Sequence, residues 1–168
     1  MFEIESRNPD EIILTTKKAE IKFNVAEETI DAKLEVGKIV GPGEFEIGDV
    51  AIRGIAVGAP SVKDDTASAS VGVVGGRTIY DAVIGNTHIG IIGGVEDAKA
   101  LDDLGMSDVL CTSSVRAVRE IEPKVVIAMG NVDGMVTELK LTPRAEKKFK
   151  IKNREALPMA LEVVALAS

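Results

Sequence analysis

The chain has 168 residues, of which 28% are charged and 45% hydrophobic, the balance of an ordinary globular protein. Its formal net charge of −7 argues against non-specific binding to nucleic acid and against anchoring on an anionic membrane surface. One histidine, one cysteine and no tryptophan exclude a site built from several imidazoles, an internal disulfide, a cysteine-rich zinc site and an aromatic platform for stacking bases.

The length is that of one domain, and we expect residues 1–168 to form it, with a core that needs neither a disulfide nor a metal. The sequence shows no signal-peptide pattern. Its apolar runs are all shorter than the roughly 20 residues that a membrane-spanning helix needs. We therefore expect a cytoplasmic protein that does not bind membranes.

The first half of the chain has the patterning of β-strands. Residues 19–25 alternate strictly between apolar and polar side chains, which is typical of a half-buried strand. Residues 2–5 and 12–16 are further strand candidates, separated by a predicted turn at residues 8–10.

Two later pairs of strands are predicted to be joined by tight turns. Gly48-Asp49 and Gly85-Asn86 each lie between two strand-like runs, and glycine tolerates the positive φ that the first position of a type II′ turn requires. The predicted hairpins pair residues 44–47 with 50–57 and residues 78–84 with 87–92.

The second half alternates between helical and strand patterns. A helix is predicted over residues 96–104, where Ala98, Leu101 and Leu104 share one face and Gly105 ends the helix. A second predicted helix begins at a cap formed by Ser113 or Ser114, carries Val115, Val118 and Ile121 on its inner side, and ends before Pro123. Strands are predicted over residues 108–112, 124–129, 136–141 and 161–166.

Hairpins followed by strand–helix–strand units predict two sheets, or one folded sheet, with helices covering an outer face. Several segments, in order, resemble the metallo-β-lactamase fold, in particular its branch of small predicted zinc-dependent hydrolases related to ascorbate-phosphate lactonase. The run from Gly41 to Ile47 reads Gly-Pro-Gly-Glu-Phe-Glu-Ile where that family writes Gly-Pro-Gly-Glu-Tyr-Glu-Val. Further matching segments are residues 50–55, 78–93, 108–110, 123–129 and 154–166. The resemblance implies an α/β fold, a metallo-β-lactamase-like αβ/βα sandwich that is truncated and β-rich in its first half.

The family's main metal-binding motif has no counterpart in this sequence. The family binds metal through a His-x-His-x-Asp-His run, and this sequence contains none. The matching segment is either shortened to residues 26–38 or, when aligned to residues 12–22, has Lys17, Ala19 and Lys22 at the ligand positions.

The remaining ligand positions of the family are also changed. Gly94 matches the bridging Asp, Gly130 matches the His that follows Pro-Met, and Lys63, beside Asp64, matches the His of the middle loop. A catalytic zinc needs three protein ligands and an open position for the water that it activates. The resemblance therefore implies a retained fold without its metal centre, and we expect no metal, no cofactor and no catalytic residue.

The ancestral pocket is the candidate ligand site. In the resembled fold, the turns after Gly94 and Met129 line the same end of the sheets. Asp97, Asn131 and Asp133 there offer oxygen atoms for Mg²⁺ or a polar ligand, although Asp and Asn in loops are more often simply turn formers. The candidate ligand-binding residues are Lys63, Asp64, Gly94, Asp97, Gly130, Asn131 and Asp133.

Two further residues receive structural interpretations. The polar–apolar alternation around His88 turns its side chain away from Ile89 and Ile91, which predicts a surface or partly buried strand histidine. Cys111 ends an apolar strand, and with no basic cluster near it in sequence we expect a buried, inert thiol.

The leading functional hypothesis is a non-catalytic protein, or pseudo-enzyme, with a structural, oligomer-forming or ligand-binding role. The alternative is a zinc-dependent hydrolase of the lactonase-like branch, which would take ligands from a partner chain or from a different alignment. A second alternative is a sensor that binds a small molecule or an anion in the ancestral pocket.

We also expect a homo-oligomer. Shortening the metal-binding segment should uncover apolar surface and a strand edge, and the mean hydropathy of +0.16 is high for an acidic protein. A homodimer or higher even oligomer, with Ile21, Phe23 or Val25 in its interface, would cover that surface.

Overall fold

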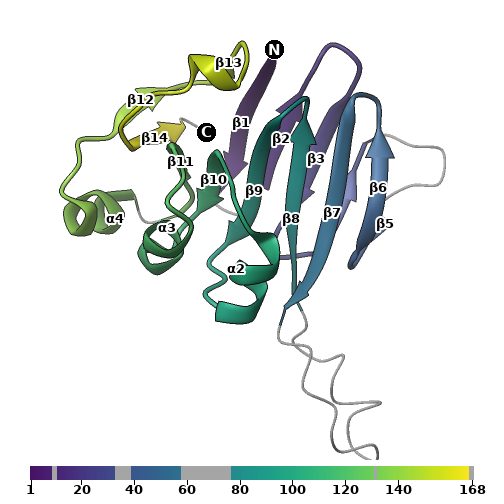
Figure 1. Cartoon of the computed structure of the whole chain (residues 1–168), viewed down its shortest axis with the longest axis horizontal. Helices are drawn as coiled ribbons and strands as arrows, with labels where there is room; N and C mark the ends of the chain where they lie inside the picture. The colour runs from purple at the N-terminus through teal and green to yellow at the C-terminus, as the bar shows by residue number, and fades with distance from the viewer. Residues whose placement is uncertain (9–10, 33–38, 58–76, 131, 167–168) are drawn as a thin grey trace, which may run out of the picture.

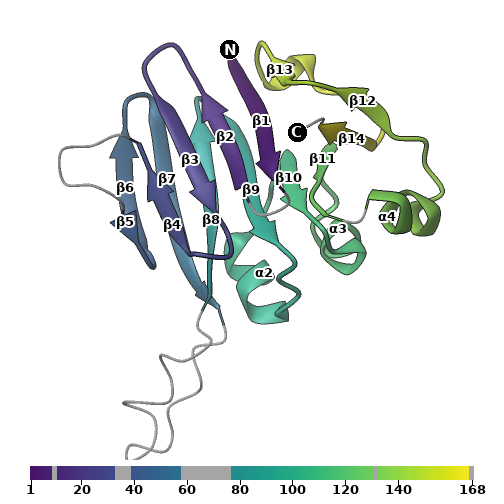
Figure 2. The ribbon, with the colours of Figure 1, turned by 180° about the vertical axis from the view of Figure 1, so that it is seen from behind.

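Two facing β-sheets and three α-helices make up the computed structural model, which describes residues 1–8, 11–32, 39–57, 77–130 and 132–166 (Figure 1). The prediction of two sheets with helices on an outer face is confirmed. In the views from both sides, the helices lie along one sheet, and the opposite face of the other sheet carries no helix of the described residues (Figure 2). The described helices include none that is long and apolar enough to cross a membrane.

The six-stranded sheet, here sheet A, is antiparallel throughout, in the order β13-β1-β2-β3-β4-β5. Its strands are β1 (Phe2–Asn8), β2 (Glu11–Thr15), β3 (Glu20–Asn24), β4 (Thr29–Asp31), β5 (Ile39–Val40) and β13 (Phe149–Ile151).

Strand β3 follows the predicted alternation, since Glu20 and Lys22 are exposed while Ile21 and Phe23 are fully buried between the sheets. The expectation that Ile21 or Phe23 forms an interface between copies was therefore wrong. Both side chains belong to the protein's own core, and Val25 also packs against it.

The eight-stranded sheet, here sheet B, has the order β12-β14-β11-β10-β9-β8-β7-β6. Strands β6 to β9 pair antiparallel, and β9, β10, β11, β14 and β12 run parallel. Its strands are β6 (Gly43–Ile47), β7 (Val50–Val57), β8 (Arg77–Ile84), β9 (Thr87–Gly93), β10 (Val109–Thr112), β11 (Val125–Ala128), β12 (Arg144–Glu146) and β14 (Glu162–Leu166).

Both predicted hairpins form as type II′ turns. Gly48 and Gly85 each have φ +61°, whereas Asp49 and Asn86 are not among the described residues with positive φ. A positive φ at the first central position alone distinguishes type II′ from type I′.

The helices are α2 (Ala98–Leu104), α3 (Val115–Ile121) and α4 (Val132–Leu139), with a short 3₁₀ turn η1 (Arg154–Ala156). Asp97 caps α2, so this helix begins two residues later than the predicted range of 96–104, and Ser114, one of the two predicted cap residues, caps α3.

The strand prediction for residues 136–141 was wrong, because most of that segment belongs to α4. One face of α4 packs against the apolar core between sheet B and the helices. The residues on this face have helical spacing and are Val132, Met135, Val136 and Leu139. The predicted strand began at residue 136 and therefore included only the second half of this helical pattern.

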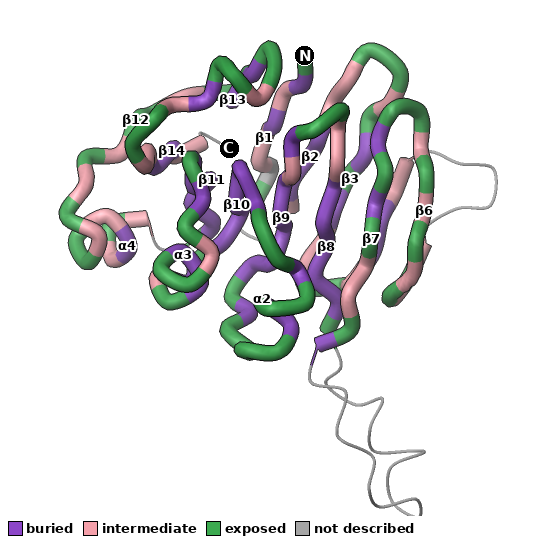
Figure 3. The backbone as a smooth tube through the Cα atoms, viewed as in Figure 1, coloured by how far each residue is buried: buried purple, intermediate pink, exposed green. Residues whose placement is uncertain are grey.

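Two apolar cores hold the layers together. One lies between the sheets and includes Phe23, Tyr80 and Phe149, and the other lies between sheet B and the helices and includes Leu101, Leu104 and Val118. The central strands β10 and β11 of sheet B contribute to both cores, and all of their residues are buried (Figure 3). These strands therefore form a rigid support for the side chains at their two ends.

Candidate functional site

The carboxyl ends of three neighbouring parallel strands meet at one edge of sheet B. Gly94, Ser113 and Gly130 follow β9, β10 and β11. A Cβ atom added to Gly94 would lie 3.2 Å from the Ser113 Oγ, and one added to Gly130 would lie 3.7 Å from the Ser113 Cβ. The two glycines therefore flank Ser113, which confirms the expectation that the turns after Gly94 and Met129 share one end of the sheets.

Hydrogen bonds hold these strand ends together. The Thr112 hydroxyl donates to the Gly93 carbonyl at 2.6 Å, and the Ser113 N–H donates to the same oxygen at 2.9 Å. The Met129 N–H donates to the Thr112 carbonyl at 2.9 Å. Thr112 is fully buried, so its hydroxyl and these backbone groups form a polar network that holds the backbone around the two glycines.

An apolar side chain covers this end from sheet A. Val25, in the turn after β3, packs so closely on Gly93 that an added Cβ would lie 2.9 Å from the Val25 Cγ2. Gly93 also has φ +55°, a conformation that favours glycine. Close packing and backbone conformation together explain why glycine stands at this position.

A cavity of about 260 Å³ lies beside Gly94. The Thr78 hydroxyl, on a residue that is 3% exposed, donates to a Glu28 carboxylate oxygen at 3.4 Å. The pKa of the fully buried Tyr80 is raised, first by its burial and then by the negative charge of Glu28. The lining residues are Val25, Ala26, Arg77, Thr78, Ile92, Gly94 and Val95.

Two of the remaining predicted ligand residues, Asp97 and Asp133, lie within the described part of the chain. The Asp97 carboxylate accepts a hydrogen bond from the Ala100 N–H at 3.0 Å and so acts as the helix cap. Asp133 is exposed in the first turn of α4. Lys63, Asp64 and Asn131 lie outside the described residues.

The side chains at this end do not fit a zinc ion. Zinc requires imidazole, thiolate or carboxylate ligands, whereas the strand ends present two glycines, a serine and a valine. Within the part of the chain that the structure describes, no group of three or more His, Cys, Asp or Glu residues could hold a metal ion.

The fold has a clear structural counterpart. A solved structure from Thermotoga maritima, of a protein proposed to be a Zn-dependent hydrolase of the metallo-β-lactamase superfamily, matches this chain with a TM-score of 0.66. The match covers 99% of this chain and 98% of that chain. The chain has the metallo-β-lactamase fold. Sequence identity to that structure is 15%, which shows the fold alone. No family model matches the chain, and no curated protein matches its sequence at a significant level.

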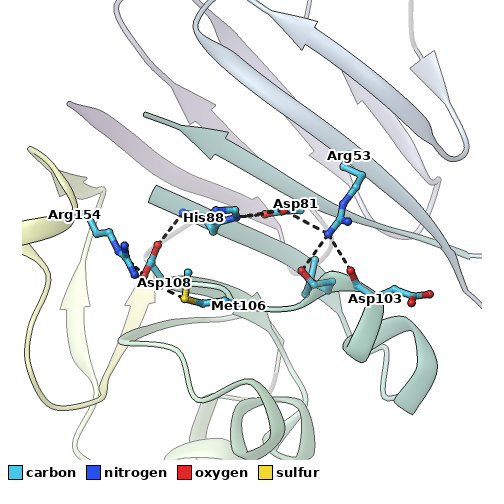
Figure 4. A network of polar contacts seen from close by, with 8 residues as sticks. Arg53, Asp81, His88, Asp103, Met106, Asp108 and Arg154 are labelled. Atoms are coloured by element: carbon cyan, nitrogen blue, oxygen red, sulfur yellow. Dashed lines mark hydrogen bonds and ion pairs between the residues drawn. The ribbon is translucent and has the colours of Figure 1, made fainter. Parts of the chain in front are cut away.

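A second polar cluster lies at the opposite end of β9 in this metallo-β-lactamase fold (Figure 4). The His88 Nδ1 lies 3.3 Å from both carboxylate oxygens of Asp81, whose side chain is 6% exposed. The Arg53 guanidinium lies 3.7 Å from the same carboxylate and donates to the Asp103 and Leu104 carbonyls at the end of α2. Asp81, on β8, thus contacts one residue from each neighbouring strand, and Arg53 extends these contacts to the end of α2.

A second buried carboxylate extends this cluster on the other side of His88. The Asp108 carboxylate accepts from the His88 backbone N–H at 2.9 Å and from the Arg154 Nε at 3.1 Å. Arg154 also contacts the sulfur of Met106. The cluster therefore ties β8, β9 and η1 to the loop before β10.

The contacts of this second cluster are structural, because they join neighbouring strands, a helix end and η1. Burial raises the pKa of Asp81, and His88 and Arg53 oppose that rise. The nearby Ser107 is 2% exposed, so its hydroxyl is closed to a substrate. The prediction of a partly buried strand histidine is confirmed, because the His88 side chain is 33% exposed and Ile89 and Ile91 point into the core.

Sequence reasoning missed the partners of His88. Asp81 interrupts an apolar strand, and Asp108 directly precedes one, so a charged residue at a buried strand position was the available signal. Cys111 agrees with its prediction, because it is fully buried and that burial raises the pKa of its thiol.

Proposed function

We propose that this chain is a non-catalytic protein of the metallo-β-lactamase fold, whose role is binding or structural. The observation that carries the proposal is the set of residues at the carboxyl ends of β9, β10 and β11. Gly94 and Gly130 flank Ser113, and Val25 packs on Gly93. Zinc hydrolysis needs three ligands and a water held by the ion, and no group of three or more His, Cys, Asp or Glu residues that could hold a metal lies among the described residues.

The backbone supports the same proposal. Gly130 has φ +77°, in the left-handed region, where a histidine would be strained by about 1–2 kcal/mol. The single histidine of the chain, His88, lies at the other end of β9 and is already bound to Asp81. A zinc-dependent hydrolase would therefore need ligands from a partner chain or from residues outside the described ranges.

A graft of the two missing ligands tests this proposal. We expect Gly94→Asp combined with Gly130→His to show no turnover of lactone or phosphodiester substrates in the presence of zinc, because two ligands leave the ion under-coordinated. The activity is measured against wild type and against Gly94→Ala with Gly130→Ala, which carries similar backbone strain without ligands. Turnover in wild type, or turnover created by the graft alone, would contradict the proposal.

The cavity beside Gly94 supports a second candidate function, the binding of a small anion. Arg77 lines it and forms no ion pair among the described residues, while Thr78 adds a hydroxyl and Ile92 and Val95 add apolar wall. Glu28 beside Thr78 opposes a highly charged ligand, which favours a monoanion.

A thermal-shift series with acetate and inorganic phosphate tests this second function. We expect millimolar anion to raise the melting temperature of wild type but not of Arg77→Gln, because ligand that binds only the native state stabilises it. Arg116→Gln on α3 is the matched control, since it removes one exposed cation elsewhere. An equal shift in all three proteins would refute a site at Arg77.

A further inference from the structure

Two edge strands at opposite ends of the molecule carry opposite charges. Strand β6 is the edge of sheet B and pairs with β7, and β13 is the edge of sheet A and pairs with β1. On β6, Glu44 and Glu46 are exposed while Phe45 is half-buried. On and beside β13, Lys148 and Lys150 are exposed while Phe149 is buried.

The cation opposite the acidic edge, Arg53, is already engaged with other groups. Within the described residues, neither Glu44 nor Glu46 forms an ion pair. The residues opposite them on β7 are Arg53 and Ala51, and Arg53 already contacts Asp81 and the end of α2. Among the described residues, these two carboxylates therefore stand on an edge strand without an ion-pair partner.

The basic edge already pairs with one strand of the same pattern. The Lys148 Nζ lies 2.9 Å from a Glu5 carboxylate oxygen, and the Lys150 Nζ lies 3.6 Å from Glu3. Strand β1 reads Phe-Glu-Ile-Glu from Phe2, with its glutamates on the lysine side and its apolar residues in the core. Strand β6 reads Glu-Phe-Glu-Ile from Glu44 and repeats this alternation.

We propose that β6 of one copy of this chain pairs with β13 of a second copy. The acidic and apolar faces of β6 then meet the basic and apolar faces of β13 in the same way as those of β1 do within the chain. Lys148 and Lys150 remain 46% and 60% exposed, and each ammonium has three donors, so both can bind a second row of carboxylates.

Charge disfavours the two-fold alternatives. Pairing β6 with β6 would set glutamate beside glutamate, and pairing β13 with β13 would set lysine beside lysine, which is destabilising in a cross-strand pair. A contact between two different edges is heterologous, and each copy keeps one free edge of each kind. The association therefore continues beyond a dimer, as a ring or an open chain. Because β6 and β13 are short, we expect it to be weak and to appear at high protein concentration.

Sedimentation equilibrium of the full chain over a concentration series tests this inference. We expect the average mass to rise from 17.7 kDa beyond that of a dimer, and to fall again as salt is added. Glu44→Lys with Glu46→Lys should hold the mass near 17.7 kDa. Asp102→Lys with Glu138→Lys makes the same charge change on the exposed faces of α2 and α4 and should leave the association intact.

A mixing experiment distinguishes this contact from any other. The variant Lys148→Gln with Lys150→Gln loses the basic edge at β13 but keeps the acidic edge at β6. The variant Glu44→Lys with Glu46→Lys loses the acidic edge but keeps the basic one. Each variant alone should stay monomeric, and an equal mixture should form a dimer and stop there, because each copy then has one usable edge. A wild-type mass that stays at 17.7 kDa, or an association that the β6 substitutions leave unchanged, would overturn the inference. Circular dichroism melts of both variants show that they are folded.

Discussion

Among the single residues of this protein, Asp81 has the most consequential environment. Its carboxyl group is almost completely buried on β8 and faces His88 and Arg53, with Asp108 close enough to add a repulsive charge. Burial is the largest influence on its pKa and raises it above 3.8, the ordinary value. Between the ordinary pKa and this raised pKa, the folded state binds more protons than the unfolded state. The contribution of Asp81 to stability therefore falls as the pH rises through that window.

Asp81→Asn should remove this pH dependence. As the pH is lowered from neutral toward the raised pKa of Asp81, we expect the unfolding free energy of wild type to increase relative to that of the variant. Urea denaturation at a series of pH values measures the difference. The same comparison in a His88→Gln background separates Asp81 from the imidazole that faces it. A difference that is constant with pH in both backgrounds would mean that Asp81 does not titrate in this way.

At the scale of secondary-structure elements, Asp97 has two possible roles, as a ligand-binding residue or as the cap of a helix. Sequence reasoning placed it in a ligand site, and the structure uses its carboxylate as the N-cap of α2. We expect Asp97→Ala to lower the unfolding free energy by about 0.5–2 kcal/mol and Asp97→Asn to retain most of it, because Asn is also a good N-cap. Denaturation of the three proteins measures this. Equal stability of Asp97→Ala and wild type would show that the cap is not used.

Elements with a complete local signal were predictable. The alternation in β3, the glycines that begin both type II′ turns, and the cap of α3 each depend on residues adjacent in sequence. Helix α4 was misassigned because its apolar face begins at Val132, before the segment that had been read as a strand. Strands β12 and β13 were missed because each is three residues long and depends on pairing with distant strands.

For the candidate site, too, one part was predicted from the sequence and another part was missed. The grouping of Gly94 and Gly130 followed from the resemblance to the metallo-β-lactamase fold, and it holds because parallel neighbours place their carboxyl ends together. The cluster of Asp81, His88 and Asp108 depends on the loop before β10 meeting the start of β9, which no local pattern encodes.

At the scale of the whole molecule, the metallo-β-lactamase fold presents two different ends of the same parallel strands. Ionisable side chains gather at the amino end of β9, where two buried carboxylates fix His88 and two arginines. The carboxyl ends, where the resembled family holds its metal, present Gly94, Ser113 and Gly130 beneath Val25. A buried network of backbone and hydroxyl hydrogen bonds stabilises that end. The described residues at the carboxyl ends therefore support the proposed role other than zinc hydrolysis.

The zinc content of the protein tests this account most directly. The chain is purified without a histidine tag, incubated with zinc, dialysed against chelator-free buffer and analysed for metal by mass spectrometry. We expect far less than one zinc per chain, because the described residues offer no set of three ligands. One zinc per chain that survives dialysis, and that is lost when His88 is replaced by alanine, would contradict the account.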